Sequence, residues 1–153
     1  MIVVRQARPA DAEDVQRVFD AAFEPVRKIY RPSTEMIAHA KCLELERLVA
    51  TDDERIVGTV RFRVDSERVG VIGLAVEPSR QRRGVARAIV EALREIAIER
   101  GCRELGLFTI RQTGNVEVFR RLGFAVMWER PETWSTSTCG EDLVEVYMLR
   151  PVS

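Results

Sequence analysis

Four arginines and a glycine are clustered in one short stretch of the sequence. Arg80, Arg82, Arg83 and Arg87 fall within eight residues that contain no acid, and Gly84 lies among them. The planar guanidinium group presents a fork of N–H donors that matches the oxygens of a phosphate. Arginines alone would suit a solvated surface equally well, so the elements around the cluster decide its interpretation.

The cluster lies between a buried strand and a long helix. Residues 69–76 are apolar on both faces, as in a central, covered strand. An apolar stripe at helical spacing then predicts a helix from about Gly84 to Arg100. A helix start leaves backbone N–H groups unpaired and attracts anions, and Gly84 and Ala86 leave little side chain over those groups. The combination favours a ligand that carries a diphosphate, although the G-K-[ST] of a P-loop is missing.

The rest of the composition excludes several other chemistries. His39 is the only histidine, and the three cysteines form no C-x-x-C pair, so we expect no metal site and no His-based triad. The 24 basic residues are balanced by 24 acidic ones, which argues against nucleic-acid binding. No apolar run approaches the roughly 18 residues of a membrane span, and no signal peptide is visible. We therefore expect a cytoplasmic protein that binds neither nucleic acid nor membrane.

Periodicity along the chain predicts a mixed α/β fold with the element order βααβββαβαββ. The length and the lack of a linker predict one domain over residues 1–153. The expected helices are residues 11–23, 33–40, 84–100 and 115–122. The expected strands are residues 2–4, 48–51, 56–64, 69–76, 105–110, 124–128 and 143–149. The crossover helix predicts that the strands on either side of it are parallel.

Three segments carry further expectations about the surface. Arg61 and Arg63 alternate with apolar residues, which predicts a strand with one buried and one solvent-facing side. Residues 31–33 contain a proline and are expected to break the chain between the first two helices. Residues 133–141 are expected to form a polar loop between the last two strands.

The segment Gln81-Arg82-Arg83-Gly84-Val85-Ala86 resembles the Q/R-x-x-G-x-G/A signature of the GNAT superfamily of acyl-CoA-dependent N-acyltransferases. The preceding Leu74-Ala75-Val76 fits the same family, and Phe119-Arg120-Arg121-Leu122-Gly123-Phe124 looks like its F/Y-x-x-x-G-F element. The order of the elements agrees along the whole chain. The resemblance implies a splayed central sheet of about seven strands and an N-acetyltransferase that uses acetyl-CoA as co-substrate.

The resemblance also implies where coenzyme A would bind. Its pyrophosphate would lie on the backbone amides of residues 81–86, close to Arg87. Its pantetheine arm would extend the sheet along residues 74–76, with the Val76 amide near the thioester carbonyl. The implied cofactor-binding residues are Leu74, Ala75, Val76, Gln81, Arg82, Arg83, Gly84, Val85, Ala86, Arg87, Asn115 and Phe119.

The catalytic acid and base stay open, because two positions depart from the family pattern. Phe119 stands where many relatives have a tyrosine, and Gly70 stands where some relatives have a base. Three candidates remain, each with a structural alternative. Glu77 would act through water, or it is an exposed loop acid. Tyr30 would line the acceptor site and Tyr147 would replace the missing tyrosine, or both are packing residues.

These observations lead to one main functional hypothesis and one from another class. The first is an N-acetyltransferase that moves an acetyl group from acetyl-CoA to a primary amine by direct attack in a ternary complex. The second is a non-catalytic acyl-CoA-binding sensor or regulatory module, which the two departures keep open. The acceptor would be a small molecule or a protein amine that the sequence does not identify. Relatives often dimerise through their last strands, so a homodimer also stays open.

Overall fold

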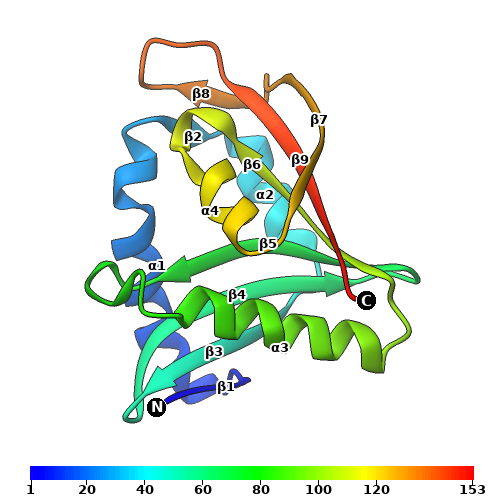
Figure 1. Ribbon diagram of the computed structural model, residues 1–153. Helices are drawn as coiled ribbons and strands as arrows, with labels where there is room; N and C mark the ends of the chain where they lie inside the picture. The colour runs from blue at the N-terminus through cyan, green and yellow to red at the C-terminus, as the bar shows by residue number, and fades with distance from the viewer.

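A central sheet of seven strands organises the computed structural model, which describes residues 1–153 (Figure 1). The strand order is β1-β3-β4-β5-β6-β9-β7. The strands are β1 (Ile2–Gln6), β3 (Glu46–Asp52), β4 (Arg55–Val64), β5 (Arg68–Val76), β6 (Glu104–Ile110), β7 (Ala125–Pro131) and β9 (Val144–Pro151). Only β5 and β6 are parallel, and all other neighbours are antiparallel. The expected mixed α/β sheet with one parallel crossover is confirmed.

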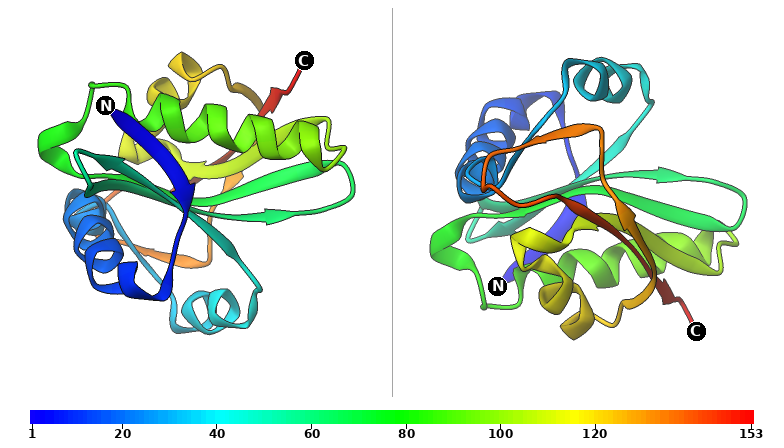
Figure 2. Two further views of the ribbon diagram at one scale, coloured as in Figure 1. Left: turned by 90° about the horizontal axis from the view of Figure 1, so that it is seen from below. Right: turned by 90° about the horizontal axis from the view of Figure 1, so that it is seen from above.

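Four α-helices cover the two faces of this sheet. They are α1 (Ala12–Arg27), α2 (Thr34–Cys42), α3 (Val85–Glu99) and α4 (Asn115–Arg121). Figure 2 shows α1 and α2 on one face and α3 and α4 on the other. None of the helices is both long and apolar enough to cross a membrane.

The main core lies between α3 and the sheet. Ile89 and Leu93 of α3, one turn apart, are fully buried against Phe62 of β4, Leu105 of β6 and Met148 of β9. Full burial of a side chain of this size contributes roughly 1.5–3 kcal/mol to stability. A smaller cluster packs α1 onto the opposite face. The larger core therefore fixes the position of α3, and with it the position of the arginine-rich turn before α3.

The sheet divides into two halves beyond the middle of β5. β5 pairs with β6 only as far as Val71 and Leu107. On its other side β5 stays paired with β4 up to Val76, and β6 stays paired with β9 up to Ile110. Each half is thus continuous, and the two halves separate between β5 and β6 (Figure 1). The splayed sheet that the sequence resemblance implied is present.

A β-bulge in β5 lies at the point of separation. Arg61 of β4 faces Gly73, but the next residue, Phe62, faces Val71, so Ile72 is an extra residue. A bulge bends its strand and increases the local twist. The last residue of β5 that pairs with β6 is Val71, directly before the bulge. The bulge therefore accounts for the divergence of β5 from β6.

Two short strands were not expected from the sequence. β2 (Tyr30–Pro32) and β8 (Ser135–Ser137) form an antiparallel pair that is separate from the main sheet. Residues 31–33 separate α1 from α2 and residues 133–141 connect β7 to β9, as expected, but each segment also contributes to one of these short strands. Neither segment has an apolar alternation, so local periodicity does not predict a strand there. The pairing joins residues about a hundred positions apart in the chain.

A substitution at Gly58 tests the close contact between α3 and β4. A Cβ atom at this position would lie 2.8 Å from Val85 Cγ1 and 3.0 Å from Ile89 Cδ1. We expect Gly58→Ala to lower the free energy of unfolding by about 1–3 kcal/mol, because the first turn of α3 must move outward. Urea denaturation measures the loss. Gly70→Ala is the matched control, because a Cβ there meets only one atom, at 3.8 Å. Equal losses in both variants would contradict this explanation.

Candidate functional site

The turn between β5 and α3 presents a run of unpaired backbone N–H groups. Gly84 has a φ of +86°, and it is the N-cap of α3. The first bond of the helix runs from the Ala88 N–H to the Gly84 carbonyl oxygen, over 3.0 Å. The N–H groups of residues 82–87 donate to no acceptor in the chain. This arrangement can attract an anion, because the N–H groups of residues 84–87 open the helix and its dipole adds to them.

Gly84 keeps the space above these N–H groups open. A Cβ atom built on Gly84 would have no atom within 4 Å. The positive φ is a conformation that residues with a Cβ rarely adopt, so the turn itself requires glycine. The signature residues that the sequence indicated therefore carry most of these unpaired donors, which we call the amide cradle, and the binding of a diphosphate there stays a prediction.

The four arginines of the cluster have different roles. The Arg80 Nη1 donates to Asp52 Oδ2 over 2.8 Å, an ion pair that ties the turn to the hairpin between β3 and β4. Arg87 donates to the Arg121 carbonyl at the end of α4, over 3.1 Å. Arg82 and Arg83 are exposed and form no ion pair. Arg80, which is not among the expected cofactor-binding residues, is therefore neutralised by a carboxylate of the chain.

The end of β5 offers an unpaired strand edge to the space between the two halves of the sheet. The Glu77 N–H donates to the Val57 carbonyl on the β4 side, over 2.8 Å. Because N–H directions alternate along an antiparallel strand, the Val76 N–H points to the opposite side, away from β4. The Val76 carbonyl accepts a hydrogen bond from Gln81 Nε2 at 3.3 Å. An extended ligand could therefore pair with residues 74–76 as an added strand.

Asn115 and Phe119 lie across the separation from β5. They belong to α4, which packs against β6 and β7. The Asn115 N–H donates to the Thr113 hydroxyl over 3.2 Å, and the Phe119 ring packs edge-on against Phe124 with 5.9 Å between ring centroids. The turn before α3 and α4 are joined by the hydrogen bond from Arg87 to the Arg121 carbonyl, and the free edge of β5 leads into that turn. The individual cofactor contacts stay predictions.

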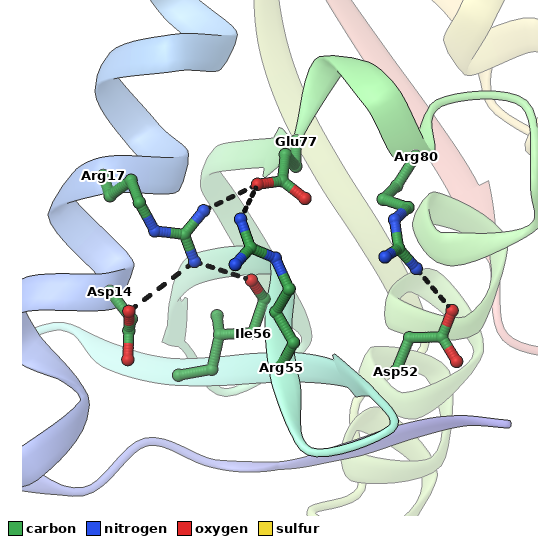
Figure 3. A network of polar contacts seen from close by, with 7 residues as sticks. All are labelled: Asp14, Arg17, Asp52, Arg55, Ile56, Glu77 and Arg80. Carbon is green, nitrogen blue, oxygen red and sulfur yellow. Dashed lines mark hydrogen bonds and ion pairs between the residues drawn. The ribbon is translucent and has the colours of Figure 1, made fainter.

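Glu77 is held by two arginines where β5 ends (Figure 3). Its Oε1 accepts hydrogen bonds from Arg17 at 2.6 Å and from Arg55 at 2.7 Å, and its side chain is only 12% exposed. The alternative of an exposed loop acid is therefore wrong. The hydrogen bond from Arg55 is the largest cause that lowers the pKa of Glu77, with a smaller contribution from Arg17. A lower pKa makes the carboxylate a weaker base, and its catalytic role stays a prediction.

The two candidate tyrosines lie in different parts of the molecule. Tyr30 is in β2, where burial, and secondly the charge of Glu132, raise its pKa. Tyr147 is in β9, and burial raises its pKa as well. Tyr147 faces Phe108, the first residue of β6 beyond the end of the β5–β6 pairing. No hydrogen bond or ion pair joins Glu77, Tyr30 and Tyr147, so the structure does not assemble the three into one catalytic group.

Sequence analysis missed two residues of the face under α1. Arg61 is half-buried beneath Phe19 of α1, with 5.1 Å from its guanidinium carbon to the ring centroid. Arg47 of β3 lies directly opposite Arg61 in the β3–β4 register. The expectation that Arg61 lies on a solvent-facing side is wrong, because α1 covers that side of β4. Strand alternation finds the two faces of a strand but does not show which helix packs on the polar one.

Neutralisation of Glu77 provides a pH-dependent test of its ion pairs. Because the pKa of the folded state is lowered, the pairs stabilise the protein above the unfolded pKa of about 4.3 and lose this effect as the pH falls through the folded value. We expect Glu77→Gln to cost about 1.5–3 kcal/mol at pH 7 and progressively less below pH of about 4. Thermal melting of both proteins from neutral to acidic pH measures the loss of stability. Glu95→Gln on α3 is the control, since Glu95 is exposed and unpaired; a loss that does not change with pH would contradict the prediction.

Comparison with known proteins agrees with this geometry. The family model described as Acetyltransferase (GNAT) family matches residues 12–124. The ribosomal-protein-S18-alanine N-acetyltransferase from Escherichia coli is 19% identical, with a TM-score of 0.74 and coverage of 100% of this chain and 95% of that chain. No curated protein is significantly similar to the sequence.

Two further solved structures were determined with the coenzyme. The PaiA N-acetyltransferase from Thermoplasma acidophilum in complex with coenzyme A is 17% identical, with a TM-score of 0.73 and coverage of 99% of both chains. A GNAT family acetyltransferase from Elizabethkingia anophelis with acetyl-CoA bound is also 17% identical, with a TM-score of 0.69 and coverage of 98% of this chain and 97% of that chain. These similarities establish the fold, and the family model covers most of the sequence. The chain belongs to the GNAT family of acetyltransferases.

Proposed function

We propose that this protein is an N-acetyltransferase that transfers an acetyl group from acetyl-CoA to a primary amine in a ternary complex. The observation that carries the proposal is the run of six unpaired amides at residues 82–87, next to an unpaired edge of β5. Amides at a helix start bind phosphate oxygens, and a strand edge binds an extended chain that contains amide groups. Coenzyme A carries both features, a pyrophosphate and a pantetheine arm.

The residues of the chain would have separate tasks in this complex. The amides of residues 82–87, assisted by Arg82 and Arg83, would bind the pyrophosphate. Bound acetyl-CoA would supply a thioester, whose carbonyl carbon accepts the amine nitrogen and whose thiol leaves. The Val76 N–H points into the separation of the sheet, where it would donate to the thioester oxygen as negative charge develops there.

Proton transfer is expected to involve Tyr147. A lysine-type amine has a pKa of about 10.4 and must lose a proton before it attacks. The leaving thiol has a pKa of about 8.5 and must gain one. A tyrosine hydroxyl has a pKa of about 10 and is protonated at neutral pH, and burial raises the pKa of Tyr147 further. Tyr147 faces Phe108 beyond the end of the β5–β6 pairing, and its hydroxyl lies over Gly106, one residue before that end. Tyr147 is therefore our proposed acid, while Glu77, with its lowered pKa and two arginine partners, is the weaker candidate for a base.

A second candidate function is a non-catalytic acyl-CoA-binding module. It is favoured by Phe119 of α4, which stands where many relatives have a tyrosine. Phe119 packs against Phe124 and has no proton to donate. Gly70, at the position where some relatives have a base, has no side chain. Both functions need the coenzyme, so binding alone does not separate them. The release of free thiol when acetyl-CoA and an amine panel are added separates them, since only an enzyme produces it.

Coenzyme binding is tested by a charge placed in the amide cradle. We expect acetyl-CoA to raise the melting temperature, and Gly84→Glu to weaken its binding at least about tenfold, a loss of about 1.4 kcal/mol. Gly140→Glu is the matched control, because Gly140 has a φ of +81°, close to the +86° of Gly84, and equally open surroundings. It adds the same charge under the same backbone strain in a distant loop. An unchanged affinity of Gly84→Glu for acetyl-CoA would contradict the proposed binding of the pyrophosphate at residues 82–87.

Removal of one hydroxyl group tests the proposed acid. We expect Tyr147→Phe to lower kcat about 10²-fold or more, as for the loss of a general acid, with little change in the KM for acetyl-CoA. Thiol release with a saturating amine gives both constants. Tyr30→Phe serves as the comparison, because it removes the same group from β2. A normal kcat in Tyr147→Phe, or a loss confined to Tyr30→Phe, would contradict the assignment.

A further inference from the structure

Two arginines on the face covered by α1 have no acidic partner in the chain. Arg47 of β3 and Arg61 of β4 are direct cross-strand neighbours. All other partly buried arginines form an ion pair with a carboxylate, whereas these two form none. Like charges directly opposite each other destabilise a sheet, and burial of an unpaired charge adds to the cost. The folded chain maintains this arrangement although it has 24 acidic residues.

The contacts of Arg61 fix its guanidinium group in place. The group lies under the Phe19 ring and directly over Gly73 of β5, where a Cβ would be 3.1 Å from Nη2 and 3.3 Å from Nε. A side chain at position 73 would therefore displace the group. Nε is closed off from solvent without a hydrogen-bond partner. Burial lowers the pKa of Arg61, and burial together with the charge of Arg61 lowers that of Arg47, as expected for cations that lack an anion.

The open end of the Arg61 guanidinium consists of its two Nη atoms. Nε is the only buried side-chain nitrogen or oxygen in the chain that lacks a partner. The Nη atoms donate no hydrogen bond within the chain, so both must reach solvent. Two parallel N–H donors at one end of a guanidinium match the two oxygens of a carboxylate. Arg47 and Arg61 together carry two positive charges that no acid of the chain pairs with. The negative charge of a bound carboxylate would reduce the repulsion between them.

The position of Arg61 connects it with the proposed transfer site. Gly73, beneath the guanidinium, directly follows the bulge at Ile72 and lies in the part of β5 that no longer pairs with β6. The fork therefore lies next to the point where the sheet separates, on the face that carries α1. Phe108, which is 56% exposed, continues the opposite side of the separation on β6.

We propose that Arg61, supported by Arg47, binds a carboxylate of the amine acceptor, so that the acceptor is a small amino acid or a close analogue. This inference rests on the proposed function, because it assigns the second substrate of the same transfer. The carboxylate sits on the fork over Gly73, and the amine of the same molecule points toward the separation between β5 and β6. The other arginines near β5 do not provide such a site, since Arg55 and Arg17 are occupied by Glu77.

Binding without turnover gives the first test. The protein is saturated with coenzyme A, which has no acetyl group to transfer, and its melting temperature is measured with each common L-amino acid and with the matching L-amino acid amide. The amide keeps the size of the ligand but removes its negative charge. We expect at least one acid to raise the melting temperature while its amide does not. Equal shifts for acids and amides, or no shift with any acid, would overturn the proposal.

Charge removal at the two arginines gives the second test. With the amino acid that shows the largest shift, we expect Arg61→Gln to raise the KM about 10–100-fold, the effect of a lost charge-assisted hydrogen bond, and Arg47→Gln to raise it less. Arg61→Lys restores part of the affinity, because the charge returns without the fork. The KM for acetyl-CoA stays unchanged. Arg63→Gln is the matched control, two residues along the same strand, where the arginine is exposed and pairs with Asp65.

The outcomes separate this inference from the proposed function. Thiol release with amides as readily as with acids, unaffected by Arg61→Gln, would leave the transferase standing and overturn the carboxylate site. Acid-specific thermal shifts that Arg61→Gln removes, without any thiol release, would support the site and contradict the enzyme. If Arg63→Gln raised the KM for the amino acid as much as Arg61→Gln, the effect would come from a general loss of positive charge. That result would also overturn the proposal.

Discussion

The separation of β5 from β6 is the constraint on which the rest of this structure depends. Both strands lie in the middle of the sheet, where an unpaired edge leaves backbone N–H and carbonyl groups without partners. The extra residue Ile72 turns β5 away after Val71, and the pairing with β4 holds the diverging part of β5 in place. The unpaired groups thereby become available to a ligand instead of to a neighbouring strand.

The crossover helix completes the site because it starts where the free edge ends. Burial of the apolar face of α3 against the sheet fixes its first turn, and Gly58 allows that turn to approach β4 closely. The unpaired amides of residues 82–87 consequently lie at the start of α3, in the turn that follows β5. Ion pairs around Glu77 and between Arg80 and Asp52 hold the connecting turn from outside (Figure 3). Rigid placement of donors of this kind lowers the ordering cost of binding.

The net charge of the chain is zero, but its arginines have three different kinds of surroundings. Some neutralise a carboxylate and hold elements together, as Arg17 and Arg55 do with Glu77. Arg82 and Arg83 are exposed and unpaired next to the amide cradle. Arg61 is enclosed by α1 and β5 and finds no acid. Residue type alone does not distinguish these three situations, because each depends on which groups the fold brings within reach.

The sequence by itself determined the features that depend on local periodicity and local backbone chemistry: the buried strand, the amphipathic helix after it, and the small residue Gly84 at the start of that helix. The tertiary structure alone decided the pairing of β2 with β8, the burial of Glu77 and the covering of Arg61 by α1. These features join residues far apart in the chain, and they leave no periodic signal. Local patterns therefore led to the prediction of a diphosphate site, whereas only long-range packing placed the unpaired Arg61 beside the bulge of β5.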